Sequence, residues 1–195
     1  MTLTAVAASV LGAGCSGGPA HDHGSRIAQI SVPGSSYAGS RLAEPWRRPA
    51  FTLIDQDGQP FDFTAETAGK PTLLFFGYTH CPDVCPTTMA DISRALQDVP
   101  RDVASRTRVV FVTTDPARDT PEALGPWLSL FDRQLPNRFI GLAGTQAEVD
   151  LAQQAARVPL VKSNGTEHAN SVLLYGPDGP GPRAPDSGRR RGHRS

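Results

Sequence analysis

The sequence predicts an α/β fold in which a central sheet carries helices on both faces. Apolar residues gather in continuous runs of strand length, such as TLLFFGY at 72–78 and RVVFVTT at 108–114. Such runs are typical of strands that are buried on both sides. Segments with helical spacing or helix-capping residues lie between the runs, and this alternation indicates a layered α/β sheet. At 195 residues, the chain has room for one domain of ordinary size with tails.

A β-hairpin is expected where the folded part begins, near Phe51. The segment FTLIDQDGQPFDF, 51–63, places two short strands around the turn signal Asp57-Gly58. The apolar run 72–78 follows and is expected to form the central strand.

A helix is expected after the central strand, over residues 87–99. Its apolar residues Met89, Ile92 and Leu96 recur at the i, i+3 and i+7 positions of a helix face. The second buried strand, 108–114, then continues the alternation of strand and helix.

The next helix is expected to open at Thr120-Pro121, because a proline at the first helical position has no N–H to lose. Asp119 and Thr120 are interpreted as the caps of this helix. The remaining elements are a strand from Arg138, a helix opened by the capping box Thr145–Glu148, and a last strand over 171–175.

Composition divides the chain into four regions. Residues 1–15 resemble a bacterial lipoprotein signal ending at Cys15, which would be lipidated; the alternative is a disordered leader with an incidental cysteine. Residues 16–48 are rich in Gly, Ser, Pro and Ala and predict a flexible linker. Residues 49–179 hold the folded domain, and the basic Pro/Gly/Arg tail 180–195 is expected to be disordered.

Charge and hydropathy disfavour two classes of protein. The formal net charge is +0, so no overall basic field indicates nucleic-acid binding. No apolar run reaches the length of about 18 residues that a membrane-spanning helix needs. Membrane contact is therefore expected through a lipid on Cys15.

Two of the 3 cysteines, Cys81 and Cys85, lie between the central strand and the following helix. Sites in α/β sheets form beyond the carboxyl ends of strands, and a helix N-terminus favours a thiolate. The spacing puts both sulfurs on one side, which permits a disulfide, a redox switch or a metal site. Structural zinc needs four ligands, whereas soft thiolates select Cu(I).

Two thiolates need at least a third ligand to hold a metal ion. His80 adjoins Cys81 but is expected to point away from it, and His193 lies in the tail. His168, just before the last strand, is the remaining candidate, and its alternative is an ordinary surface residue.

Four segments, LLFFGYTHCPDVCPTT, VVFVTTDPARDTPEAL, FIGLAG and HANSVLLYGPDG, together resemble the Sco/SenC family. Its members are thioredoxin-like copper proteins that help to assemble the copper centre of cytochrome c oxidase. The resemblance covers residues 50–179 and includes a Cys-x-x-x-Cys-Pro motif. It implies a thioredoxin-like fold in which Cys81, Cys85 and His168 bind Cu(I) or Cu(II), and in which the two cysteines also cycle to a disulfide.

The function implied by this resemblance is that of a bacterial, extracytoplasmic lipoprotein on the cytoplasmic membrane, closer to a metallochaperone than to an enzyme. The implied partners are the oxidase subunit that carries the copper centre, other copper chaperones and thioredoxin-like reductants. The alternative is a thiol–disulfide oxidoreductase that keeps a partner's cysteines reduced, which needs Cys81 and Cys85 but not His168. A peroxidase of the same fold is disfavoured because the chain lacks a Thr-x-x-Cys arrangement.

Two acidic residues are candidates for a supporting role at this site. Asp83 lies between the cysteines and would tune the thiol pKa and the copper charge, unless it is a turn residue. Asp115 ends the second buried strand and either faces the site or forms a turn. The chain also departs from the family: Gly176 replaces the usual Asp, and the sequence after 179 lacks the pattern of the family's final strand and helix, which are expected to be missing.

Overall fold

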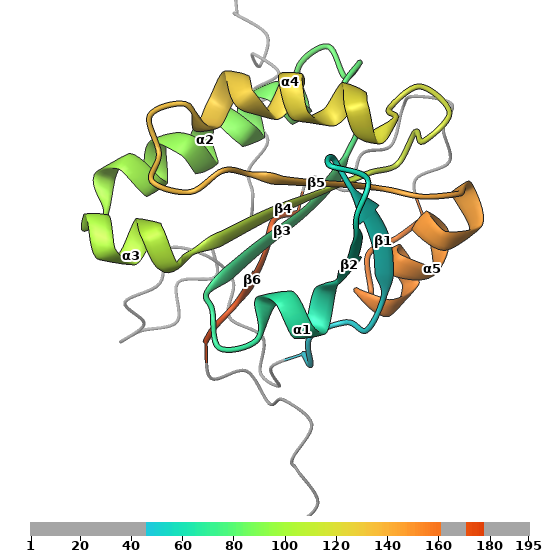
Figure 1. Cartoon of the computed structure of the whole chain (residues 1–195), viewed down its shortest axis with the longest axis horizontal. Coiled ribbons are helices and arrows are strands. Elements are labelled where there is room, and N and C mark those ends of the chain that lie inside the picture. The colour runs from blue at the N-terminus through green and yellow to red at the C-terminus, as the bar shows by residue number, and fades with distance from the viewer. Residues whose placement is uncertain (1–45, 161–170, 178–195) are drawn as a thin grey trace, which may run out of the picture. The chain divides into compact units, whose positions relative to one another are not determined.

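A six-stranded mixed sheet forms the centre of this computed structural model, which describes residues 46–160 and 171–177 (Figure 1). The strands are β1 (Thr52–Asp55), β2 (Pro60–Asp62), β3 (Thr72–Gly77), β4 (Arg108–Thr113), β5 (Ile140–Ala143) and β6 (Leu173–Tyr175). Their order across the sheet is β2-β1-β5-β4-β3-β6. The central strands β3, β4 and β5 are parallel, and β1, β2 and β6 join the sheet in antiparallel pairs.

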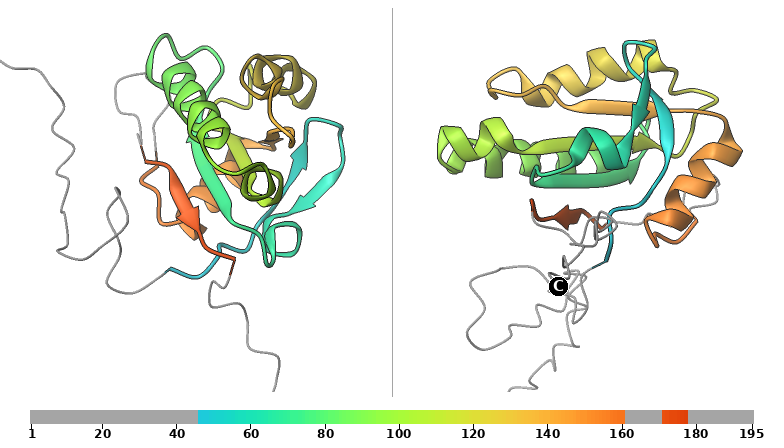
Figure 2. Two further views of the ribbon diagram at one scale, coloured as in Figure 1. Left: turned by 90° about the vertical axis from the view of Figure 1, so that its left-hand side faces the viewer. Right: turned by 60° about the horizontal axis from the view of Figure 1, so that its bottom comes forward.

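Helices cover both faces of this sheet, as the sequence predicted. They are α1 (Phe63–Thr67), α2 (Val84–Asp98), α3 (Arg101–Arg106), α4 (Pro121–Asp132) and α5 (Gln146–Ala155). α2 and α4 lie on one side of the sheet, and α1 and α5 lie on the other (Figure 2). Within the described ranges, no helix is long and apolar enough to span a membrane.

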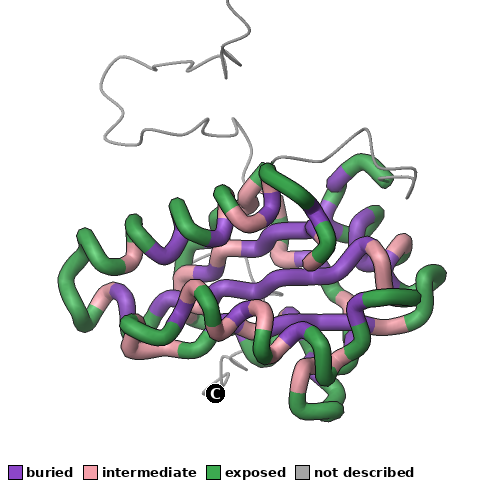
Figure 3. Tube along the Cα trace, turned by 90° about the horizontal axis from the view of Figure 1, so that it is seen from above, coloured by how far each residue is buried: buried purple, intermediate pink, exposed green. Residues whose placement is uncertain are grey.

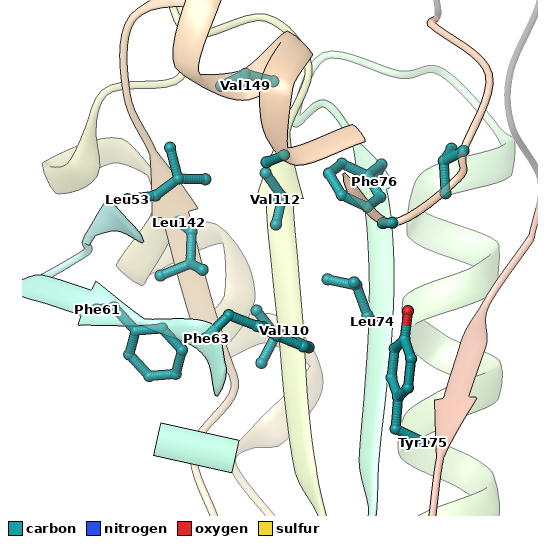
Figure 4. Packing of buried hydrophobic residues seen from close by; sticks show 13 residues of the cluster. Leu53, Phe61, Phe63, Leu74, Phe76, Val110, Val112, Leu142, Val149 and Tyr175 are labelled. Carbon is teal, nitrogen blue, oxygen red and sulfur yellow. The ribbon is translucent and has the colours of Figure 1, made fainter. Parts of the chain in front are cut away.

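Each face of the sheet has its own hydrophobic core. On one face, side chains from all six strands pack with Phe63 of α1 and Val149 of α5 (Figure 4). The other core lies against α2 and α4, and it contains both Cys81 and Cys85 beside aromatic and aliphatic side chains. The tube in Figure 3 is accordingly buried along the central strands and exposed on the outer sides of the helices. The thiols therefore belong to a packed core and not to an open surface.

Local signals in the sequence found most of the strands and two helix starts. The hairpin is confirmed, with Leu53 opposite Phe61 and with Gly58 at φ 75° in the turn, a conformation that glycine favours. The capping box at the start of α5 is also confirmed, because Thr145 and Glu148 exchange both of its hydrogen bonds.

Two short helices, α1 and α3, were not predicted. They have 5 and 6 residues, which is too short for a periodic apolar pattern to be recognised. α2 begins at Val84, earlier than expected, so that Cys85 lies in its first turn. The strand and helix expected to be missing would follow residue 179 and fall outside the described residues, as do the leader and the tail.

Candidate functional site

The two thiols lie where β3 ends and α2 begins. β3 ends at Gly77, a short loop carries Cys81, and Cys85 follows in the first turn of α2. Pro86 is tolerated next to Cys85 because the first-turn N–H groups have no partner within the helix. The site is thus at the carboxyl end of the parallel strands, where the sequence placed it.

Gly77 makes room for the second thiol. A Cβ atom at this position would lie 2.9 Å from Cys85 Sγ and 3.1 Å from ring atoms of both Phe75 and Phe111. Real Cβ atoms do not approach heavy atoms so closely, so any larger residue would displace the sulfur or a ring. The absence of a side chain at the last residue of β3 therefore determines where Cys85 lies.

Both cysteines are free thiols with little contact to solvent. The exposed fractions of Cys81 and Cys85 are 5% and 1%. The backbone N–H of Cys85 donates a hydrogen bond to Cys81 Sγ at 3.3 Å. The backbone N–H of Cys81 in turn donates to the carbonyl oxygen of Tyr78, also at 3.3 Å, which closes the loop into a turn.

The surroundings shift the pKa values of the two thiols in opposite directions. Burial raises the pKa of Cys81, but hydrogen bonds to its sulfur, chiefly from the backbone at Cys85 and Asp83, outweigh this effect and bring the pKa below 9.0. Burial raises the pKa of Cys85 to about 12, and the neighbouring Cys81 and Asp119 contribute to the rise. Near neutral pH, Cys81 is therefore the nucleophile of the pair and Cys85 retains its proton.

A buried carboxylate supports the loop that carries Cys81. Asp119 is fully buried, and its Oδ2 accepts hydrogen bonds from the Thr79 backbone N–H at 2.8 Å and from the Thr113 hydroxyl at 2.7 Å. Its Oδ1 accepts a further hydrogen bond from the Thr79 hydroxyl at 2.6 Å. The interpretation of Asp119 as a helix cap is therefore wrong. Thr120 occupies the N-cap position of α4, without a side-chain capping bond, and the Asp119 carboxylate faces the loop after β3.

Comparison with known proteins assigns this arrangement to a family. The family model described as SCO1/SenC matches residues 42–184, which is most of the chain. The chain belongs to the SCO1/SenC family.

Relatives within the SCO1/SenC family share both sequence and fold with this chain. A protein of Stutzerimonas stutzeri described as a putative copper-binding protein is 37% identical over 137 residues, which cover 67% of this chain and 65% of that protein. The structure of Bradyrhizobium japonicum ScoI with copper bound is 36% identical, covers 69% of this chain and 85% of the other, and gives a TM-score of 0.57. Yeast Sco1 with copper bound is 30% identical at the same TM-score, over 68% of this chain and 75% of the other.

These similarities confirm the thioredoxin-like α/β fold expected of a SCO1/SenC protein. The matched region spans just under two thirds of the Stutzerimonas relative and 58% of a SCO2-like protein of Rickettsia felis.

The structure brings together some of the predicted site residues of this SCO1/SenC chain. Cys81 and Cys85 are adjacent, whereas Asp83 is exposed at the N-cap position of α2 and makes no side-chain capping bond. Asp115 forms an ion pair with Arg118 and opens a turn, since its carbonyl oxygen accepts from the N–H groups of Arg118 and Asp119. His168 and Cys15 lie outside the described residues.

Sequence reasoning missed the positions that shape the loop. Gly77 packs against Cys85, and Asp119 accepts a hydrogen bond from Thr79. The fold creates both contacts, so no local sequence pattern indicated them. The signal for Gly77 was its place between an apolar run and the cysteine motif. Among the described residues, no group of three or more His, Cys, Asp or Glu side chains is arranged to hold a metal ion.

Proposed function

We propose that this chain binds copper through Cys81, Cys85 and His168 and takes part in the assembly of cytochrome c oxidase. Copper is supported by the family and by the two similar structures that are described with copper bound. The Sco family is described as one of cytochrome c oxidase assembly proteins, which supports the oxidase as the destination of the copper. Copper is then cargo that the chain receives and passes on.

The observation that carries the proposal is the pair of free, buried thiols at the start of α2. Two adjacent sulfurs in a largely apolar core are a donor set that a soft ion such as Cu(I) prefers, and an imidazole would accommodate Cu(II) as well. Because Gly77 has no side chain, Cys85 Sγ can pack directly against the end of β3. The donor set therefore fits copper better than a hard, oxygen-preferring ion.

Each cysteine has its own task in copper binding. The hydrogen bonds around Cys81 lower the pKa of its thiol and so favour the thiolate form that binds metal. Cys85 keeps its proton in the metal-free protein and releases it when copper binds. Because protons compete with the metal for both sulfurs and for an imidazole, we expect copper affinity to fall as the pH falls.

His168 is the proposed third ligand, and its replacement tests the assignment. Copper stoichiometry and the Cu(II) absorption spectrum are measured for the wild type, for His168→Ala and for His193→Ala, a matched control in the C-terminal tail. His168→Ala should weaken binding and change the spectrum, and His193→Ala should change neither. Equal affinity and equal spectra in all three proteins would contradict the ligand assignment.

Two acidic residues are proposed to act at a distance from the copper. Asp83 is exposed and carries its charge between the two cysteines, so its effect would be a moderate tuning of copper charge. The ion pair of Asp115 with Arg118 favours a role in the turn before α4 over a direct effect on the metal.

We further propose that the domain 49–179 is held outside the cytoplasm by a lipid on Cys15, with 16–48 as the linker. The proposal rests on the signal-like sequence that ends at Cys15. Mass spectrometry of the mature protein from membranes would detect the lipid. A cytoplasmic protein that retains Met1 would contradict both the lipid and the location.

A thiol–disulfide oxidoreductase is the second candidate, and the difference between the two thiols favours it. The Cys81 thiolate would attack a partner's disulfide and release one partner thiolate. Cys85 would then lose its proton and attack Cys81 Sγ, which frees the second partner thiolate and leaves a Cys81–Cys85 disulfide. This activity would survive His168→Ala, so the same variant separates the two functions.

A further inference from the structure

Asp119 is a buried carboxylate that neither the copper ligands nor the thiol exchange uses. We propose that Asp119 is a positioning residue, which fixes the loop carrying Cys81 and, through the Thr79 hydroxyl, fixes the tautomer of His80. The inference rests on the proposed function only in that the site being positioned is the Cys81–Cys85 pair.

Three segments meet at the Asp119 carboxylate. Thr113 is the last residue of β4, Thr79 lies in the loop between β3 and Cys81, and Asp119 itself precedes α4. Both Oδ atoms accept hydrogen bonds from Thr79, and Oδ2 also accepts one from Thr113. Hydrogen bonds to a carboxylate are stronger than those between neutral groups, so the loop is tied to β4 two residues before the first cysteine.

The single hydrogen of the Thr79 hydroxyl determines which ring nitrogen of His80 faces it with a hydrogen. That hydroxyl donates to Asp119 Oδ1 at 2.6 Å, so at its 3.0 Å contact with His80 Nδ1 it has to be the acceptor. Nδ1 of His80 therefore carries a hydrogen, and it lies 3.5 Å from Asp119 Oδ1. The result is a chain of hydrogen bonds from His80 Nδ1 through the Thr79 hydroxyl to Asp119 Oδ1, which favours the Nδ1–H tautomer over the Nε2–H tautomer.

The same reasoning applies to Thr113, on the other side of the carboxylate. Its hydroxyl donates to Asp119 Oδ2, so it accepts from the backbone N–H of Asp115 at 3.0 Å. Asp119 thus orders the turn after β4 as well as the loop after β3. The backbone at Thr114 adds a direct link, because its N–H donates to the Gly77 carbonyl oxygen at 2.7 Å.

Replacement of Asp119 by Asn removes one of the two oxygens that accept these bonds. Asn is nearly the same size, but its single oxygen can occupy only one of the two positions, so either the two bonds at Oδ2 or the bond from the Thr79 hydroxyl at Oδ1 is lost. The loop should loosen, and the N–H groups that face Cys81 Sγ should lose their alignment. We expect Cys81 in the reduced, metal-free full-length protein to be alkylated about tenfold more slowly at neutral pH, the effect of losing one charge-assisted hydrogen bond. Peptide mapping separates Cys81 from Cys15 and Cys85.

Matched threonine variants separate positioning from stability. Thr113→Val removes the hydroxyl and should slow Cys81 alkylation, and Thr113→Ser restores the hydroxyl and should restore the rate. Thr107→Val removes a hydroxyl that donates to the Val103 carbonyl oxygen just before β4, at the far end of that strand. This control should lower stability and leave Cys81 alkylation unchanged.

The tautomer of His80 gives a readout that a purely structural role would not move. In the wild type, the ¹⁵N shifts of the His80 ring should identify Nδ1 as the protonated nitrogen, and Thr79→Ser should keep this pattern. Thr79→Val should shift the ring toward the Nε2–H form.

Three results would overturn the inference: an Nε2–H ring in the wild type, a Cys81 alkylation rate within twofold of wild type or faster in Asp119→Asn, or Thr113→Ser behaving like Thr113→Val. If Asp119→Asn fails to fold, the Thr113 and Thr79 pairs decide the question. None of these measurements uses copper, so a wild type that binds no copper would refute the proposed function and leave this inference to be judged by its own results.

Discussion

The two ends of the central strand β3 each hold an ionised group among threonine hydroxyls, and they differ in what they support. At the start of β3, the Arg48 guanidinium donates to the hydroxyls of Thr67 and Thr72 and to the carbonyl oxygens of Lys70 and Gly176. At its other end, the Asp119 carboxylate accepts from Thr79 and Thr113. The central side chain is thus a hydrogen-bond donor in the first cluster and a hydrogen-bond acceptor in the second.

Similar hydrogen bonds can therefore stabilise the fold at one end of a strand and position the residues of a site at the other end. Arg48 joins the segment before β1 to the ends of α1 and β6, and its guanidinium lies 5.7 Å from the Tyr175 ring centroid. No cysteine lies in that cluster. Asp119 instead accepts hydrogen bonds from the loop that leads to Cys81, directly beside the thiols.

The largest expected effect is the difference in reactivity between the two thiols at the site end. The pKa of Cys81 is below 9.0 and that of Cys85 is about 12, so at pH 8 the thiolate fractions should differ by about a thousandfold or more. Alkylation with iodoacetamide under reducing conditions, followed by peptide mapping, measures both rates. Cys81 alkylation should level off as the pH passes its lowered pKa, whereas Cys85 alkylation should continue to rise. Equal rates would refute the assignment of nucleophile and partner.

A change at the opposite end of β3 should affect stability alone. Arg48→Met keeps the length of the side chain but removes all donors, and we expect the free energy of unfolding to fall by about 2–4 kcal/mol. Urea denaturation measures the loss. Cys81 alkylation in the folded protein should match the wild type, and a changed rate would mean that the two ends of β3 are coupled.

The comparison also separates what the sequence could predict from what it could not. Apolar runs, the Asp57-Gly58 turn and the Thr145–Glu148 capping box act over a few residues, and they led to the sheet, the hairpin and a helix start. The cysteine pair was found because both of its members belong to one short motif. The role of Asp119 depends on Thr79, which is 40 residues away, and only the parallel pairing of β3 with β4 brings the two together.

A side chain at the last residue of β3 should disturb the site and the core together. Gly77→Ala would place its Cβ 2.9 Å from Cys85 Sγ, so we expect a loss of about 1–3 kcal/mol and weaker copper binding. Gly125→Ala in α4 is the matched control, because its Cβ would lie 3.7 and 3.8 Å from side-chain atoms of Gln56, which are ordinary contact distances. Alanine is the better helix former, but Pro126 disfavours a Cβ on the helical residue before it, so the control should change the free energy of unfolding by no more than about 1 kcal/mol. Gly77→Ala with wild-type stability and copper affinity would show that Cys85 adapts freely.

The smallest expected effect lies on β6, the strand that pairs with the start of β3. Leu174 is 60% exposed, and among the described residues β6 is the edge strand that pairs with β3 alone. Edge strands are the usual places where two chains pair. Leu174→Thr should change the free energy of unfolding by no more than about 0.5 kcal/mol, since little apolar area is buried there. Light scattering at high protein concentration should show less self-association.

Leu173→Thr is the control, because Leu173 packs against the core on the α1 side and its loss should lower stability clearly. If Leu174→Thr destabilised the protein as much as Leu173→Thr, the Leu174 side chain would have to be buried. The packed cluster around Arg48 and Tyr175 would then include the outer face of β6.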